Sequence, residues 1–196
     1  MTKEQVQQML QATTNIRDIF LIQLLFETGL RIGEALSLFM EDFVFDHAKG
    51  HRIRLVDKGE LENGAMLKTG EREIYVSQSL MDLYDDYLYE VIDELEIDSN
   101  FVFVKLRGEN TGKPMEYWNV DSLIKRLKKK TGINLHAHLF RHTHATIYYQ
   151  KTKDIKQVQE HLGHSQIQTT MNLHLHPSDE EIREEWKKAQ SAFQIT

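Results

Sequence analysis

Arginine and histidine side chains stand together in several short stretches that each adjoin a turn. Arg31 occurs in "TGLRIGEALSL", His138 and Arg141 in "HLFRHTHAT", and His164 in "LGH". A guanidinium donates two parallel hydrogen bonds to phosphate oxygens and keeps its proton, and an imidazole exchanges protons near neutral pH. Two arginines can therefore hold the extra negative charge of a phosphodiester under attack without a metal ion.

The spacing within "HLFRHTHAT" supports this chemistry. His138 and Arg141 are three residues apart, so in a helix they lie on neighbouring turns of one face and can contact the same phosphate. His142 and His144 follow directly. We expect these two histidines to serve helix packing or a neutral hydrogen bond.

A lysine on a predicted hairpin turn supplies a candidate general acid. Lys68 lies in "LKTGEREIYV", and a lysine in a β-turn can protonate a leaving oxygen. Two alternatives stay open, because "LKTGE" is also a plain turn sequence and Lys58 in "DKGE" is a nearby rival.

The elements that must position these residues are mainly helical. "TKEQVQQMLQAT" has a Thr cap, "IRDIFLIQLLFETG" is a buried helix that stops at Gly29, and a third helix begins at about Arg31. Three short β-rich segments between residues 42 and 77 predict a small antiparallel sheet. Helices return at 78–95, and from Trp118 onward nearly all of the chain reads as helix. The predicted class is mainly α with a small antiparallel β-sheet (α+β), in one domain.

Composition limits the function classes. The chain has 196 residues and no cysteine, which excludes disulfides, thiolate metal sites and a cysteine nucleophile. It contains neither an apolar run of membrane-spanning length nor a signal peptide, so we expect a cytoplasmic protein that has no contact with membranes.

The charge pattern is uneven. The net charge of -6 argues against a nucleic-acid partner, but acidic residues concentrate at 82–98 and 178–185. A basic block stands apart from them, consisting of Lys125, Arg126, Lys128, Lys129 and Lys130. Its first four members are candidates for contact with DNA phosphates, and the alternative is a plain solvated face.

Taken in order, the stretches around Arg31, Lys68, Arg141 and His164 resemble the catalytic domain of tyrosine recombinases, the phage integrase family, and more closely its transposon-borne integrases and transposases. The resemblance covers the chain from about residue 3. It implies that Arg31 and Arg141 grip the scissile phosphate and that Glu34 supports Arg31. It further implies proton transfer by Lys68 and His138, a phosphate hydrogen bond from His164, and no metal ion or other cofactor.

The nucleophile of that family is a tyrosine, and this chain departs from the pattern there. The last motif of the related transposon integrases runs Thr-Met-Asn, any residue, Tyr, any residue, His, whereas this sequence reads "TMNLHLH". His174 therefore occupies the tyrosine position. A shorter imidazole would have to attack from a backbone placed for a longer side chain, so we expect strand cleavage through a 3′-phosphotyrosine to be lost or impaired. Tyr148 and Tyr149 are expected to pack.

The resemblance also implies partners and a domain arrangement. The expected partners are a double-stranded DNA recombination site and other recombinase protomers in a tetrameric synapse. An apolar stripe of Ile182, Trp186, Ala189 and Phe193 suits either exchange of a C-terminal helix between protomers or packing on its own domain. Residues 1–196 read as a single catalytic domain, the C-terminal domain of a longer recombinase, without the N-terminal core-binding domain.

Two other functions compete with this reading. A DNA-binding module with a recombinase fold would use the same surfaces without catalysis. A histidine-ligated metalloenzyme is suggested by the pairs 136/138, 142/144, 161/164 and 174/176, although these pairs lack a clear third ligand and the chain has no HExxH motif.

Overall fold

The computed structural model describes residues 1–136, 138–163 and 183. His164, His174 and most of the predicted C-terminal stripe lie outside these residues. In residues 1–136, 138–163 and 183, no helix is both long and apolar enough to cross a membrane.

Seven α-helices and one small sheet form the described part. The helices are α1 (Lys3–Ala12), α2 (Ile16–Thr28), α3 (Ile32–Leu36), α4 (Gln78–Tyr87), α5 (Tyr117–Thr131), α6 (Leu139–Thr152) and α7 (Ile155–Leu162). A 3-10 turn at Met40–Asp42 follows α3, and a π-helical segment at Leu88–Asp93 extends α4. This mainly α fold with a small antiparallel sheet confirms the predicted class.

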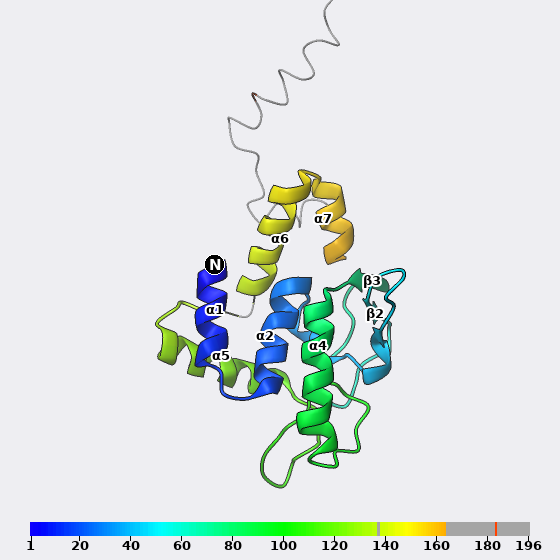
Figure 1. Ribbon diagram of the computed structural model, residues 1–196, viewed down its shortest axis with the longest axis vertical. Helices are drawn as coiled ribbons and strands as arrows, with labels where there is room; N and C mark the ends of the chain where they lie inside the picture. Colours follow the sequence, from blue (N-terminus) through cyan, green and yellow to red (C-terminus); the bar gives the residue numbers. More distant parts are fainter. Residues whose placement is uncertain (137, 164–182, 184–196) are drawn as a thin grey trace, which may run out of the picture.

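Helix α2 is the central element of the core. Asn15 caps its first turn by accepting a hydrogen bond from the Asp18 amide at 2.9 Å, and Gly29 ends it in the left-handed conformation with φ of 65°. Both signals were visible in the sequence. Its side chains are mostly buried, and the helix contacts both α4, which lies beside it in Figure 1, and α6, which lies above it.

The sheet has three antiparallel strands in the order β1 (Phe43–Val44), β2 (Arg52–Leu55) and β3 (Arg72–Tyr75). Ile53 pairs with Ile74 and both side chains are buried, so this register places alternate residues on the core. Arg72 begins β3 and pairs with Leu55. The loop between β2 and β3 carries Lys68.

Helices α6 and α7 form a second, smaller core that stands over one end of α2 and over β3 (Figure 1). Ala145 of α6 packs on Val158 and Leu162 of α7, and all three side chains are fully buried. Asp154 caps α7 by accepting from two backbone amides. Tyr148 and Tyr149 pack against this core, as expected from the sequence.

One segment differs in detail from the sequence prediction. The helix expected at 78–95 changes to π geometry after Tyr87. The apolar run at 101–104 is buried, and two isolated bridges pair Phe39 with Phe101 and Val104 with Pro114.

Candidate functional site

A buried carboxylate, Glu34, organises the candidate site. Its side chain has no solvent exposure. Oε1 accepts a hydrogen bond from the Thr69 hydroxyl at 2.6 Å, and Oε2 accepts one from the backbone amide of Arg31 at 3.0 Å. Glu34 is the third residue of α3, so this second bond also caps the start of the helix.

Three guanidinium groups surround this carboxylate. Arg31 Nη1 lies 3.3 Å from Oε1, Arg72 Nη2 lies 3.3 Å from Oε2, and Arg141 Nη1 lies 3.9 Å from Oε2. We call Glu34, Arg31, Arg72 and Arg141 the arginine cluster. Because the three guanidiniums face one carboxylate, the cluster carries a formal charge of +2, which suits an anion.

Burial and charge shift the pKa values within the cluster. Burial alone would raise the pKa of Glu34, but Arg72, the Thr69 hydroxyl, the Arg31 amide and Arg141 together lower it. Burial, with Arg31 and Arg72 nearby, lowers the pKa of Arg141 to about 9, against the opposing effect of Glu34. At pH 7 the carboxylate is therefore ionised and the guanidinium protonated.

Backbone carbonyls at two helix ends fix the arginines. Arg141 donates to Gly29 O at 2.7 Å, just past α2, and to Leu162 O at 2.8 Å, at the end of α7. Arg72 Nε donates to His161 O at 3.0 Å. The carbonyl end of a helix carries partial negative charge, so both ends favour cations here.

The three arginines differ in their access to solvent. The side chain of Arg31 is 26% exposed, that of Arg72 is 12% exposed and that of Arg141 is 5% exposed. Arg31 is therefore the member of the cluster most open to an arriving anion.

Lys68, the predicted proton donor, is adjacent in sequence to a residue that contacts the arginine cluster. Lys68 is exposed, and the next residue, Thr69, is bound to Glu34. Its rival, Lys58, forms an ion pair with Asp42 at 2.7 Å and lies over the Phe39 ring. Because Lys58 has this structural use, the geometry favours Lys68 as the candidate.

His138 and Arg141 occupy different environments. His138 is the N-cap position of α6 and is exposed, whereas Arg141 lies one turn further along and is buried. Their contact with one phosphate stays a prediction. The same holds for His164 and for the replacement of the nucleophile at His174, which lie outside the described residues.

Sequence reasoning missed Arg72 and Thr69. Arg72 is bound to Glu34, to the Thr69 hydroxyl and to a carbonyl of α7. Its only signal in the sequence is its place in "KTGERE", four residues after Lys68, where a strand begins.

The basic block on α5 is partly engaged within the protein. Arg126 forms an ion pair with the buried Asp18 at 2.6 Å, Lys128 donates to the Asn134 side chain, and Lys130 donates to a carbonyl at the end of α1. Lys125 and Lys129 are exposed. A DNA contact by this block stays a prediction.

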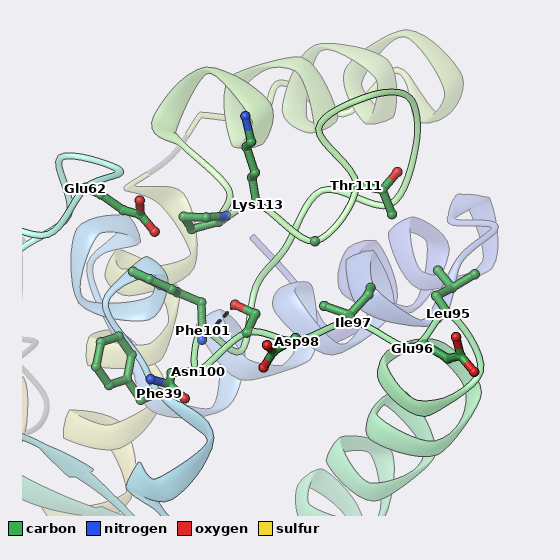
Figure 2. Close-up of a pocket in the computed structure, with 13 residues that line it drawn as sticks. Phe39, Glu62, Leu95, Glu96, Ile97, Asp98, Asn100, Phe101, Thr111 and Lys113 are labelled. Carbon is green, nitrogen blue, oxygen red and sulfur yellow. Dashed lines mark hydrogen bonds between the residues drawn. The ribbon is translucent and has the colours of Figure 1, made fainter.

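A separate depression of about 490 Å³ has the opposite charge. Figure 2 shows Glu62 and Lys113 on one side of it and Glu96 on another, with Asp98 between. Most of its lining comes from the loops near residues 95–101 and 111–114. With three acidic groups and one basic group, it is poorly suited to phosphate.

The described residues also bear on the metalloenzyme alternative. Across 1–136, 138–163 and 183, His, Asp and Glu side chains form no group of three or more that could hold a metal ion. The pairs 161/164 and 174/176 include residues outside that part of the chain.

Comparison with known proteins identifies close relatives. A model of the phage integrase family matches residues 1–181. Transposase A from transposon Tn554 of Staphylococcus aureus is 42% identical over 187 residues, covering 94% of this chain and 50% of the relative. Tyrosine recombinase XerC of Corynebacterium glutamicum is 31% identical over 183 residues, covering 91% of this chain and 54% of the relative.

A solved structure has the same fold. The Tn1549 transposon integrase in complex with a circular intermediate DNA matches with a TM-score of 0.75 at 23% identity, covering 96% of this chain and 65% of that one. The chain spans about half the length of the curated relatives that it matches.

Proposed function

We propose a role in DNA strand breakage and rejoining for this chain, which belongs to the phage integrase family. The observation that carries the proposal is the arginine cluster, where Arg31, Arg72 and Arg141 surround the single carboxylate of Glu34. This surplus of positive charge fits a phosphodiester that gains negative charge during attack.

In the proposed reaction a nucleophile attacks the scissile phosphorus while the deoxyribose oxygen leaves. The guanidiniums stabilise the nonbridging oxygens, and Lys68 or His138 supplies the proton that the leaving oxygen needs. His164 adds a hydrogen bond to the phosphate. The strand would rejoin by the reverse attack on a 3′-phosphotyrosine if the nucleophile were present.

His174 favours a second candidate, a DNA-binding module that has lost cleavage. It stands where the nucleophilic tyrosine of the related motif belongs, and the shorter imidazole changes the reach of the attacking atom. We therefore propose that the chain binds and clamps a recombination site but cleaves it weakly or not at all.

The proposed partners are a double-stranded DNA recombination site and further recombinase protomers in a tetrameric synapse. Exchange of the C-terminal helix between protomers would link them. We also propose that residues 1–196 are the catalytic domain of a longer recombinase, and that the protein works in the cytoplasm.

The test compares the chain as given with its His174→Tyr variant on a nicked suicide duplex. The duplex is taken from the ends of the mobile DNA element that encodes the protein. We expect an SDS-resistant protein–DNA adduct only with the Tyr variant. A matched control, His174→Tyr combined with Arg31→Ala, should bind the duplex more weakly and lose the adduct. An adduct with the unmodified chain would contradict the assignment of position 174.

A further inference from the structure

Three carbonyl groups at the C-terminal end of α2 each accept a hydrogen bond from a side chain of α6 or α7. The pairs are His144 Nδ1 with Phe26 O at 3.2 Å, His161 Nε2 with Thr28 O at 3.1 Å, and Arg141 Nη1 with Gly29 O at 2.7 Å. The last carbonyls of a helix have no partner within it, and side chains from elsewhere in the fold can satisfy them. We call these three bonds the α2 joint.

The α2 joint connects the two arginines that the family resemblance singles out. Arg31 follows Gly29 by two residues, and Arg141 belongs to α6, the helix that the joint holds. The separation between the two guanidiniums is therefore set by how α6 and α7 sit on the end of α2.

The two histidines of the joint pack as flat rings. The His144 and His161 centroids are 4.8 Å apart at 15°, and Tyr148 stacks on His161 at 4.8 Å and 22°. A Cβ atom at Gly29 would lie 2.7 Å from Cδ2 of His144. The position of the imidazole therefore requires glycine at residue 29.

A carbonyl can only accept, so His144 carries its proton on Nδ1 and His161 carries its proton on Nε2. Burial, His161 and Arg141 lower the pKa of His144 to about 4, while its bond to Phe26 O opposes this. Burial, with Arg72 and Arg141, also lowers the pKa of His161 against the bond to Thr28 O. Both rings are therefore neutral at pH 7.

Other charged groups approach the joint from several elements. Arg141 of α6 and Arg72 of β3 face His161, whose neighbours in the stack are His144 and Tyr148. Three more groups line a depression beside His144: Lys3 of α1, Glu27 of α2 and Lys151 of α6. Protonation of the second ring nitrogen of either imidazole would place a cation beside two arginines, which disfavours the packed arrangement.

We propose that His144 and His161 are positioning residues whose neutral rings hold α6 and α7 on the end of α2 and so set the spacing of Arg31 and Arg141 for a DNA phosphate. This inference rests on the proposed function for its DNA partner, whereas the joint itself can be tested without DNA.

The experiment uses the full chain and side chains that copy one nitrogen of the ring. Glutamine at position 161 places an amide near the Nε2 position, and methionine has a similar shape without a donor. For binding of a short fluorescein-labelled DNA duplex at pH 7.5, we expect His161→Gln to match the wild type within about twofold and His161→Met to bind about tenfold more weakly. Equal affinity of the two variants would overturn the proposal.

A pH series separates positioning from plain packing. The double variant His144→Asn with His161→Gln has no imidazole in the joint. We expect the affinity of the wild type, relative to this double variant, to fall several-fold as the pH is lowered from 7.5 to the pKa of His144, about 4. A ratio that does not change with pH would contradict the requirement for neutral rings.

Hydrogen exchange distinguishes failure of the joint from failure of the DNA proposal. Amides of α7 should exchange faster in His161→Met than in His161→Gln, whether or not DNA is bound. If every variant fails to bind DNA but this difference is found, the joint stands and the proposed function fails. If the α7 amides exchange equally, the joint is refuted.

Discussion

Glu34 and Asp18 are both fully buried carboxylates that gather arginines, yet their surroundings differ. Asp18 is gripped closely, with Arg17 Nη2 and Arg126 Nη2 each 2.6 Å from one of its oxygens. Glu34 lies 3.3 to 3.9 Å from its three guanidiniums. Arg141 instead makes short bonds to backbone carbonyls, at 2.7 and 2.8 Å.

The difference separates a structural ion pair from a candidate binding site. At Asp18 the short bond from Arg126 ties α2 to α5, and the carboxylate also accepts from Arg17 and from the side-chain amide of Asn15. At Glu34 one carboxylate faces three guanidiniums and cannot neutralise them all. Carbonyls at the ends of α2 and α7 also accept hydrogen bonds from two of these guanidiniums. A surplus of charge held by dipoles remains able to bind an anion.

The largest expected effect follows from removing the charge of Glu34. Glu34→Gln leaves three buried or half-buried guanidiniums facing a neutral amide, so we expect the free energy of unfolding to fall by about 3–5 kcal/mol. Urea denaturation measures this. Sulfate should restore part of the loss by binding the guanidiniums that have lost their carboxylate.

Asp18→Asn is the matched control for that experiment. Arg126 is 52% exposed on its side chain and can turn to water, so the loss should be smaller and sulfate should not restore it. Equal rescue of both variants by sulfate would remove the distinction between the two carboxylates.

The second effect compares the glycines that end α2 and α5. Gly29 and Gly132 have similar φ values of 65° and 72°, but a Cβ at Gly29 would meet the His144 ring at 2.7 Å whereas one at Gly132 meets nothing within 4 Å. Gly132→Ala should lower the free energy of unfolding by about 1 kcal/mol, and Gly29→Ala by about 2–4 kcal/mol. Thermal and urea unfolding of the two variants decide this, and equal losses would show that the α2 joint yields easily.

The sequence predicted the helices and strands better than it predicted the tertiary contacts between them. Cap residues and apolar spacing are local signals, so the start of α1 at Thr2 and the end of α2 at Gly29 could be foreseen. The family motif pointed to Arg31, Glu34 and Arg141, which do come together. Local signals say nothing of contacts across the fold, so they could not reveal that Arg72 reaches Glu34 from 38 positions away.

The same limit applies to the basic block. Arg126 looked like one cation among five in the sequence, but its partner is Asp18, 108 positions earlier in the chain. A run of charged residues predicts the sign of the charge on a surface. It does not show which of those residues form ion pairs within the protein.

The third effect separates binding from stability. Arg31→Ala should weaken binding of a DNA duplex about tenfold, because Arg31 is the most exposed cation of the arginine cluster. Arg17→Ala should leave binding within about twofold and instead lower the free energy of unfolding, since Arg17 bonds to Asp18 and to Val104 O. Fluorescence anisotropy with paired urea curves measures both. The reverse pattern would assign the binding role to the Asp18 region.

The smallest effect asks whether the region around Asp18 also contacts DNA. Lys125 and Lys129 are exposed on α5, the helix that Arg126 ties to Asp18, so removing them leaves that ion pair in place. If each binds one phosphate, the double variant Lys125→Ala with Lys129→Ala should lower the slope of log affinity against log salt by about 2. Affinity at moderate salt should fall only a few-fold. An unchanged slope would show that these two lysines do not contact DNA phosphates. The Glu34 region would then have a binding role and the Asp18 region a purely structural one.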